Sequence, residues 1–243
     1  MLQGILFLFT HMAKKQYVQE MFDHISPTYD KLNHILSLNI DKSWRNKAVR
    51  MIADRRPQHV LDIACGTGDF SIALAKAGVP MVQGIDISEG MMKVGRAKID
   101  EQRLSGRIRF QQEDSEAMTF SDSTFDAVSV AFGIRNFEHR ERALKEMYRV
   151  LRPGGMLLVL ELSVPRNRIL RGLYKLYFLH ILPAVGNLIS RDAAAYRYLP
   201  ASVLSFPPPE TFCRMVGEAG FVQVESRALT FGLCRIFTGV RNV

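Results

Sequence analysis

The sequence has few cysteines, no long apolar run and no dense basic run, and each shortage excludes a class of protein. The three cysteines, Cys65, Cys213 and Cys234, lie far apart and show no metal-ligand spacing. This argues against a structural disulfide and a metal site, and it favours a reducing compartment. The longest uncharged run, residues 176–190, is shorter than the about 20 residues that span a bilayer. We therefore expect a cytoplasmic protein without a transmembrane helix or a bound metal.

Basic residues outnumber acidic residues without clustering. The chain has 32 Lys and Arg against 24 Asp and Glu, which gives a net charge of +8 at pH 7. Such a surplus suits nucleic acid, an anionic membrane surface or solubility alone. Because no dense run of Lys and Arg occurs, nucleic acid is the least favoured of these partners. A length of 243 residues and an apolar content of 47% fit one large globular domain, alone or with a small appendage.

The most informative stretch of the chain is a glycine turn between residues 60 and 70. Residues 60–64 have the length and branching of a buried strand, and a helix is expected from Asp69 onward. Gly66 and Gly68 between them lack Cβ atoms, so the backbone can turn tightly and a ligand can lie against it. A strand, a glycine turn and a helix form the cofactor-binding corner of an open α/β sheet. The alternative is a turn that merely connects two elements.

The residues around this turn indicate which cofactor it suits. A dinucleotide fingerprint has a third glycine where this chain has Ser71, which disfavours a dinucleotide oxidoreductase. Asp62 within the strand and Asp69 after the turn would repel a pyrophosphate. An acidic pair suits a ligand with an ammonium group, such as the amino acid end of S-adenosylmethionine.

Acidic residues also follow the next two predicted strands. Asp86 ends the strand at residues 79–85, where a carboxylate can accept hydrogen bonds from both ribose hydroxyls of an adenosine. The alternative for Asp86 is turn chemistry beside a helix N-cap at Ser88. Asp114 follows residues 108–112 and is placed to accept the adenine amino group, with the backbone of Ser115 beside it.

Strands and helices alternate through most of the chain. This alternation predicts an α/β fold with a doubly wound, mostly parallel sheet, in which ligands bind at the carboxyl ends of the strands. A final antiparallel hairpin would complete seven strands, so the last strand is expected to be antiparallel. We divide the chain into an N-terminal extension with a helical lid at 1–50 and a cofactor-binding domain at 51–243, with a lid insert at about 165–205. The seven predicted strands are 60–64, 79–85, 108–112, 125–132, 156–162, 221–228 and 234–240.

Three strings of residues carry a resemblance to a known family. They are Tyr29-Asp-Lys-Leu-Asn-His-Ile-Leu-Ser37, Phe132-Gly-Ile-Arg-Asn136 and the stretch 149–163, Arg-Val-Leu-Arg-Pro-Gly-Gly-Met-Leu-Leu-Val-Leu-Glu-Leu-Ser. With the glycine turn they resemble the ubiquinone/menaquinone biosynthesis C-methyltransferases, which are Rossmann-like class I S-adenosylmethionine-dependent enzymes. The family usually has His where Asp41 stands and Lys where Arg152 stands.

The resemblance implies a cofactor, a substrate and a set of contact residues. It implies that Thr67, Asp86, Asp114 and Ser115 contact S-adenosylmethionine. It implies a prenylated hydroquinone that is methylated at a ring carbon, with demethylmenaquinol expected first. The alternatives are the benzoquinol intermediate of ubiquinone biosynthesis and a role as a non-catalytic accessory subunit. A nucleic-acid methyltransferase is disfavoured, because strand 125–132 ends in Phe-Gly-Ile-Arg-Asn rather than a base-holding motif.

The expected chemistry assigns roles to three catalytic candidates. A hydroquinone carbon becomes nucleophilic when the neighbouring hydroxyl loses its proton, so the site needs a proton acceptor and a group that stabilises the phenolate. Arg135 suits the second task, since its guanidinium stays charged; its alternative role is a salt bridge to the lid. Asn136 is expected to orient the hydroxyl or a water, and Tyr29 or His34 to complete the proton path.

The insert and the lid suggest the remaining partners. Residues 165–200 combine apolar side chains with Arg166, Arg168, Arg171 and Lys175. Such a segment suits an apolar mouth for an isoprenoid tail that rests on an anionic membrane surface at the inner face of the membrane. The alternative is packing against the lid or against a second subunit, which would make the protein a homodimer.

Overall fold

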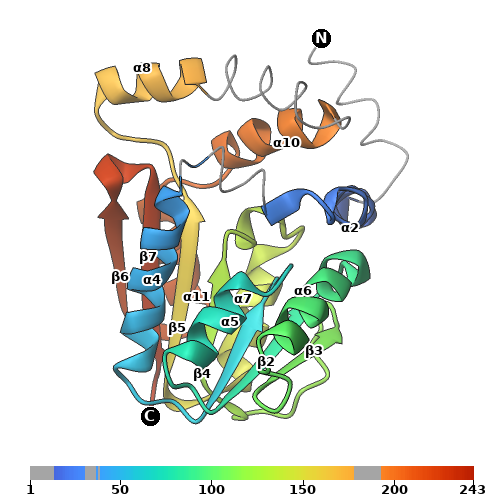
Figure 1. The fold of residues 1–243 in the computed structure, drawn as a ribbon. Coiled ribbons are helices and arrows are strands. Elements are labelled where there is room, and N and C mark those ends of the chain that lie inside the picture. The colour runs from blue at the N-terminus through green and yellow to red at the C-terminus, as the bar shows by residue number, and fades with distance from the viewer. Residues whose placement is uncertain (1–13, 31–36, 38, 178–192) are drawn as a thin grey trace.

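One central sheet of seven strands organises the molecule (Figure 1). The computed structural model describes residues 14–30, 37, 39–177 and 193–243. The predicted N-terminal extension before residue 14, His34 and residues 178–192 of the predicted insert lie outside the described residues. The strands are β1 (His59–Ile63), β2 (Met81–Asp86), β3 (Ile108–Gln112), β4 (Phe125–Ala131), β5 (Leu151–Leu162), β6 (Phe221–Leu229) and β7 (Cys234–Arg241).

The strand order confirms the predicted fold. It is β3-β2-β1-β4-β5-β7-β6, with parallel pairing from β3 to β5. β7 lies antiparallel between β5 and β6. Successive strands are added on one side of β1 up to β3 and on its other side from β4 onward, so the topological switch point lies between β1 and β4. Ligands bind at the carboxyl ends of the strands at such a point.

Helices cover both faces of the sheet. On one face, α4 (Ile40–Ala53), α5 (Asp69–Lys76) and α6 (Glu89–Glu101) bury apolar side chains against the strands. On the other face, α7 (Arg140–Val150) and α11 (Pro209–Glu218) do the same. Each helix is amphipathic, and its apolar stripe faces the sheet because burial removes that surface from water.

Most predicted strand bounds lie within two residues of the structure, but two predicted boundaries differ by more. β5 starts at Leu151 rather than at residue 156, because Leu151 still pairs with Phe125 before residues 152–155 bulge out around Gly154, whose φ is +77°. The predicted lid boundary at residue 50 falls inside α4. Trp44, Ala48 and Ile52 of that helix are buried in the core, so α4 belongs to the helical layer of the domain.

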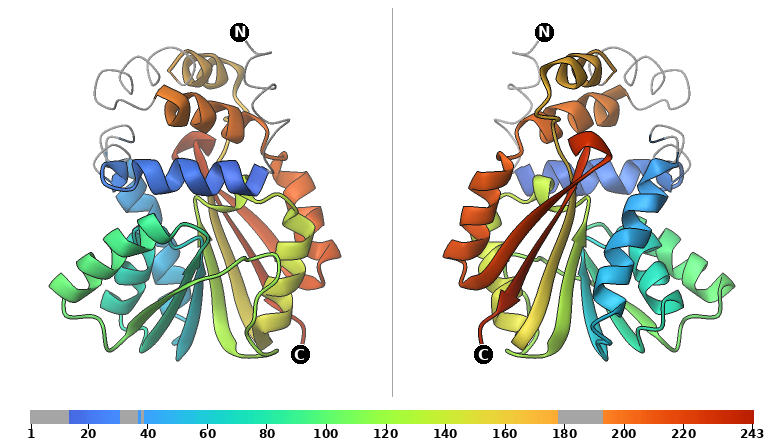
Figure 2. Two further views of the ribbon diagram at one scale, coloured as in Figure 1. Left: turned by 90° about the vertical axis from the view of Figure 1, so that its right-hand side faces the viewer. Right: turned by 90° about the vertical axis from the view of Figure 1, so that its left-hand side faces the viewer.

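A second group of elements lies above the carboxyl ends of the strands (Figure 2). It contains α2 (Lys14–Ile25), the short helix η1 (Ile134–Asn136), α8 (Arg168–Leu176), α10 (Ala193–Leu204) and the turn η3 (Thr230–Gly232). These segments are far apart in the sequence, and they meet at the end of the sheet where a ligand is expected.

Candidate active site

The glycine turn after β1 adopts a conformation that other residues disfavour. Gly66 and Gly68 have φ values of +54° and +83°, in the left-handed region that favours glycine. A Cβ atom on Gly68 would lie 2.8 Å from the ring of Phe110, so that position also lacks room for a side chain. The backbone N–H of Gly66 donates to Asp86 Oδ2 at 2.8 Å, which ties the turn to the end of β2.

A cavity lies between this turn and α2, and we call it the strand-end cavity. Of the predicted site residues, Tyr29, Gly66, Asp86, Asp114, Ser115 and Asn136 line it. Asp86 and Asp114 come from the ends of adjacent strands, and their carboxylates can only accept hydrogen bonds when charged. The ribose hydroxyls and the amino group of an adenosine are donors, so the chemistry of this lining fits the predicted cofactor.

Asp86 is an acid of this cavity whose pKa is raised well above its usual value. Its Oδ1 accepts from the Ser88 backbone N–H at 2.9 Å, while its Oδ2 accepts from Gly66. Burial nevertheless raises the pKa of Asp86 to about 6, because desolvation disfavours the charged carboxylate. Ser88 also caps α6, since its hydroxyl accepts from the Met91 N–H at 3.1 Å. The helix N-cap that was the alternative for this turn is therefore present, and the ribose contact of Asp86 stays a prediction.

Asp62 and Thr67, two further predicted contacts, lie apart from the cavity lining. Asp62 is buried beneath the turn, where it accepts from the hydroxyls of Ser71 at 2.6 Å and Ser129 at 2.9 Å. Burial raises its pKa to about 6. The Ser71 that departs from the dinucleotide pattern is thus a partner of Asp62. Thr67 donates to Asp30 at 2.5 Å, and Gly68 precedes α5 as its N-cap residue.

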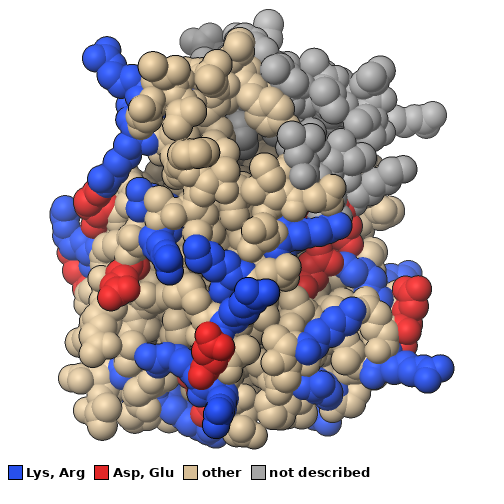
Figure 3. All heavy atoms as spheres, turned by 60° about the vertical axis from the view of Figure 1, so that its left-hand side comes forward, with Lys and Arg blue, Asp and Glu red and all other residues tan. Residues whose placement is uncertain are grey.

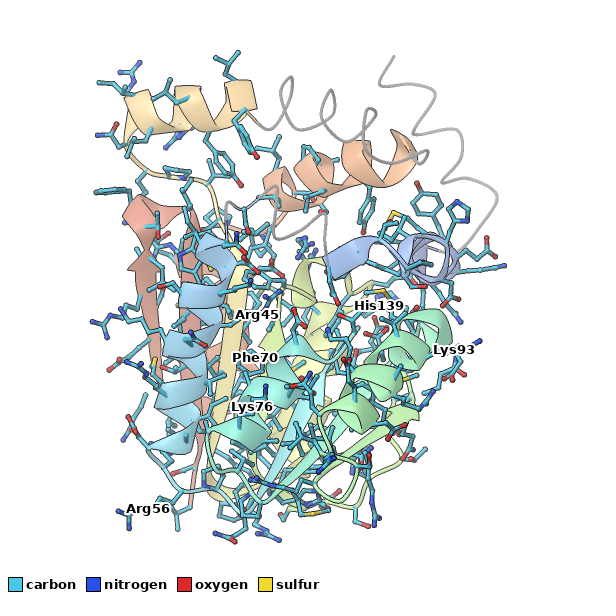
Figure 4. All side chains as sticks on the ribbon, viewed as in Figure 1. Arg45, Arg56, Phe70, Lys76, Lys93 and His139 are labelled. Atoms are coloured by element: carbon cyan, nitrogen blue, oxygen red, sulfur yellow. The ribbon has the colours of Figure 1, made fainter. Side chains whose placement is uncertain are left out.

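The acidic pair inferred from the sequence is not an open anionic site. Asp62 is enclosed by the two serines, and Asp69 forms ion pairs with Lys98 and, at 3.4 Å, with Arg45. Figure 4 shows Arg45 at the end of α4 that lies toward the carboxyl ends of the strands. Both carboxylates therefore have partners within the fold, and the contact of this acidic pair with an ammonium group stays a prediction.

The helix α2 closes the strand-end cavity on the solvent side. Its Lys15 pairs with Asp114 at 2.5 Å. Asp23 Oδ1 accepts from the Ser88 hydroxyl at 2.6 Å and from the Gly90 N–H at 2.8 Å. Lys15, Val18 and Phe22 also line the cavity, so α2 both covers it and packs into it.

A second cavity of about 400 Å³ adjoins the first, and we call it the apolar cavity. Tyr29 and Phe132 line both cavities, so these two side chains mark where the cavities meet. Phe132 has a φ of +60°, which is uncommon for a non-glycine residue and typical of strained functional positions. The remaining lining residues are Ser37, Ile40, Asp41, Trp44, Arg45, Arg135, Leu162, Pro165, Leu170, Leu173, Tyr174, Tyr177, Leu199, Phe231 and Leu233.

Arg135 reaches the apolar cavity from η1 and is held by a buried carboxylate. Its Nη1 lies 2.9 Å from Oε1 of Glu161, a fully buried residue of β5, and its Nε donates to the Ser202 hydroxyl at 3.3 Å. Burial lowers the pKa of Arg135, but the charge of Glu161, the nearby Tyr29 and Tyr198 and the hydrogen bond to Glu161 together outweigh burial, so the net shift of the pKa is upward. The guanidinium is thus a fixed positive charge. Its partner is a strand of the sheet rather than the N-terminal lid considered from the sequence.

Asn136 follows Arg135 and lines the other cavity. Its Oδ1 accepts from the Tyr198 hydroxyl of α10 at 3.1 Å, and burial raises the pKa of Tyr198. Two consecutive residues of η1 therefore reach the two adjoining cavities. This arrangement suits groups that act on two molecules bound side by side.

Three residues of the site were missed from the sequence. Asp41 is the one carboxylate among the described residues that line the apolar cavity, and it binds Ser37 at 2.6 Å and Arg45 at 2.5 Å. Glu161 holds Arg135, and Tyr174 is a buried phenol of the cavity wall. A signal existed for Glu161, because it is a charged residue within an otherwise apolar strand. No feature of the sequence marked Tyr174 as a residue of the site.

Comparisons with known proteins agree with this geometry. Residues 10–241 match the model of the ubiE/COQ5 methyltransferase family. The chain is 46% identical over 229 residues to the demethylmenaquinone methyltransferase of Bacteroides fragilis, and 94% of each chain is covered. It is 43% identical to the ubiquinone/menaquinone biosynthesis C-methyltransferase UbiE of Geobacter sulfurreducens, with 95% of this chain and 90% of the relative covered.

A solved structure supports the fold independently. It is a possible histamine N-methyltransferase from Thermotoga maritima with a TM-score of 0.64 and 19% identity, covering 92% of this chain and 99% of that chain. An identity this low shows the fold alone. Together the matches confirm the predicted family, the class I fold and the use of S-adenosylmethionine. The chain is a C-methyltransferase that belongs to the ubiE/COQ5 methyltransferase family.

Proposed function

We propose that this enzyme methylates a ring carbon of a prenylated hydroquinone, with demethylmenaquinol as the preferred substrate. The observation that carries the proposal is the apolar cavity, which joins the strand-end cavity at Tyr29 and Phe132 and holds the charged Arg135 at its wall. An apolar cavity with few polar groups suits an aromatic ring with an isoprenoid tail. The benzoquinol intermediate of ubiquinone biosynthesis is the alternative substrate, and relatives named for each pathway match the chain.

The strand-end cavity would hold the cofactor through its acidic residues. When bound, S-adenosylmethionine supplies an activated methyl group. Asp86 would accept from the ribose hydroxyls and Asp114 from the adenine amino group, with Gly66 leaving room for the ligand against the turn. Lys15 and Phe22 of α2 would exclude water from the bound cofactor.

The apolar cavity would prepare the ring for attack. A ring hydroxyl gives its proton to the Asp41 carboxylate, and Arg135 stabilises the phenolate oxygen that remains. With S-adenosylmethionine bound, the neighbouring ring carbon would take the methyl group as the sulfonium–methyl bond breaks, and S-adenosylhomocysteine would be the leaving group. The hydrogen on that ring carbon would then leave as a proton, which makes the ring aromatic again. Tyr29, which lines both cavities, would position the ring at their junction, and Asn136 would orient a polar group on the cofactor side.

Substrate choice is tested by turnover on short-chain quinols. The purified enzyme should methylate a reduced demethylmenaquinone analogue with a short prenyl tail, and it should have a lower kcat/KM with the corresponding methoxybenzoquinol. Mass spectrometry of the product locates the methyl group on the ring. Equal or reversed kcat/KM values would favour the ubiquinone pathway, and no turnover of either quinol would favour an accessory subunit.

The cofactor role of Asp86 predicts a loss of affinity in the variant Asp86→Ala. S-adenosylmethionine binding should weaken by about 1–3 kcal/mol in calorimetry at pH 7.5, because the ribose hydroxyls lose a charged acceptor. The pKa of about 6 adds a pH dependence. Below that pH the carboxylate is protonated, so wild-type affinity should fall as the pH drops through 6 while the weak binding of the variant stays flat.

Asp62→Asn is the matched control for this variant. Asp62 is a buried carboxylate whose pKa is also raised to about 6, but it binds Ser71 and Ser129 rather than lining the strand-end cavity. It should keep wild-type affinity and the wild-type pH dependence. If Asp62→Asn weakens binding as much as Asp86→Ala does, the loss reflects damage to the turn rather than a lost ribose contact.

The proposed substrate also sets where the enzyme works. A prenylated quinol resides in a bilayer, so the protein would work peripherally at the inner face of the membrane, from the cytoplasm. No described helix is both long and apolar enough to cross a membrane. The predicted homodimer stays a prediction that analytical ultracentrifugation can test; a single monomeric species would exclude it.

A further inference from the structure

Large apolar side chains are exposed on one end of the molecule, in two segments that are distant in the sequence. Ile169, Leu173 and Leu176 of α8 are 75%, 59% and 54% exposed, and Phe231 of η3 is 82% exposed. We call these four side chains the apolar face. The three residues of α8 follow the i, i+4, i+7 spacing of one helix stripe. Figure 1 shows α8 and the turn between β6 and β7 at the same end of the molecule.

The apolar face continues into the apolar cavity. Leu173 and Phe231 belong to the exposed set, yet both also line the cavity. On its inner side α8 contributes Leu170 and Tyr174 to the same lining. The helix is therefore a wall with apolar side chains on both sides, and the mouth of the cavity opens beside the apolar face.

Phe231 is held outward by a strained and anchored turn. Thr230 and Phe231 have φ values of +43° and +56°, which are unfavourable for non-glycine residues. The Thr230 hydroxyl accepts a hydrogen bond from Trp44 Nε1 at 2.8 Å, which fixes the turn to the core helix α4. A phenylalanine that is both strained and exposed gains little from packing within its own chain, so a partner outside the chain explains it better.

The charge around the apolar face is positive. Residues 163–177 contain Arg166, Arg168, Arg171 and Lys175 and no acidic residue. Arg168 is exposed and, among the described residues, enters no ion pair, whereas Arg166 pairs with Glu210 and Arg171 donates to the backbone oxygens of Pro165 and Arg166. In Figure 3 the described tan surface in the upper part of the molecule shows few charged side chains, and basic side chains lie along its left edge.

We propose that the apolar face docks on an anionic bilayer, so that the apolar cavity receives its substrate directly from the lipid. The inference rests on the proposed function, because a prenylated quinol dissolves in lipid rather than in water. Ile169, Leu176 and Phe231 enter the interfacial layer, and Arg168 lies among the anionic headgroups. The isoprenoid tail then leaves the cavity between α8 and η3 without crossing water. An apolar helix stripe beside basic residues suits a lipid surface better than a protein partner. Acyl chains can contact the apolar side chains while anionic headgroups contact the basic ones.

The test is cosedimentation of the full-length protein with vesicles. Wild type should sediment with phosphatidylcholine vesicles that contain phosphatidylglycerol, and much less with phosphatidylcholine alone or at high salt. The double variant Ile169→Gln, Leu176→Gln should lower the partition coefficient about tenfold or more. Phe231→Asn should also lower it, because asparagine tolerates the left-handed backbone and only the ring is lost. Val222→Gln replaces an exposed apolar residue of β6 and should bind like wild type.

Activity on a short-chain, water-soluble quinol separates this proposal from the proposed function. Neither Ile169 nor Leu176 lines the apolar cavity, so the double variant should turn over that substrate like wild type. It should lose activity only on a long-chain quinol embedded in vesicles. Turnover without any vesicle binding by wild type would overturn the docking proposal and leave the function intact. A wild-type dimer that the double variant dissociates would also overturn it, since a second copy would then cover the face.

Discussion

The variant Arg135→Lys is expected to lower kcat and kcat/KM together by about 10²–10³, with normal binding of S-adenosylmethionine. Arg135 lines the apolar cavity and carries a fixed positive charge where a phenolate would form. Lysine keeps the charge but loses the planar fork that binds an oxygen and Glu161 at the same time. An interaction made mainly in the transition state affects both kinetic constants equally, which steady-state kinetics on a short-chain quinol can measure.

Glu161→Gln is the comparison variant that measures how much the Arg135–Glu161 pair contributes to the stability of the fold. The Arg135–Glu161 pair is buried, so removal of the carboxylate leaves a guanidinium without its counter-charge and should cost about 3–5 kcal/mol of stability. Arg135→Lys retains a charge opposite Glu161 and should lose less. A large drop in Tm for Arg135→Lys, with kcat intact and only KM raised, would show that the residue is structural.

The variant Asp41→Asn is expected to lower kcat by about 10²–10⁴, the range that a general base contributes. Asp41 is buried at the wall of the apolar cavity and is the one carboxylate among the described residues of that wall. Asparagine has nearly the same shape but accepts no proton from a ring hydroxyl at ordinary pH. Cofactor affinity should not change, because Asp41 does not line the strand-end cavity.

Asp41→His separates the chemical role of this residue from a structural role. Histidine stands at this position in most members of the family, and its neutral imidazole is a proton acceptor. It should therefore restore much of the activity that asparagine loses. If Asp41→Asn and Asp41→His both lower Tm and have similar kcat values, Asp41 serves to hold Ser37 and Arg45 in place rather than to accept a proton.

The fold was largely predictable from the sequence because its signals are local. Apolar strands separated by amphipathic helices require a doubly wound sheet, and Gly66 and Gly68 mark the turn by their need for positive φ. Asp86 and Asp114 follow their strands directly, so placing each strand also placed its acid at the carboxyl end. The structure puts both beside one cavity. Local patterns of this kind depend on residues that are close in the sequence, so they can be recognised without knowing how the rest of the chain packs.

The surroundings of the charged residues were not predictable in the same way. The sequence did not indicate that Ser71 and Ser129 would donate hydrogen bonds to the buried Asp62 carboxylate. Ser129 faces Asp62 because β4 pairs with β1 in that register, and no local pattern specifies the partner of a buried acid. For Arg135 the sequence offered a salt bridge to the lid as the alternative role, whereas the structure pairs it with Glu161 of the neighbouring strand β5.

By itself, then, the sequence determined the class I sheet, the glycine turn, the methyltransferase family and the cofactor, because each depends on periodicity or on a short motif. Only the tertiary structure decided which side chains meet at the reacting end. Asp41, Arg135 and Tyr174 come from three segments and line one cavity because the helices and the insert converge above the strands. Phe231 joins the apolar face of α8 because β7 returns antiparallel beside β5. Contacts of this kind depend on how distant segments pack, and that packing minimises the free energy of the whole chain rather than of any one segment.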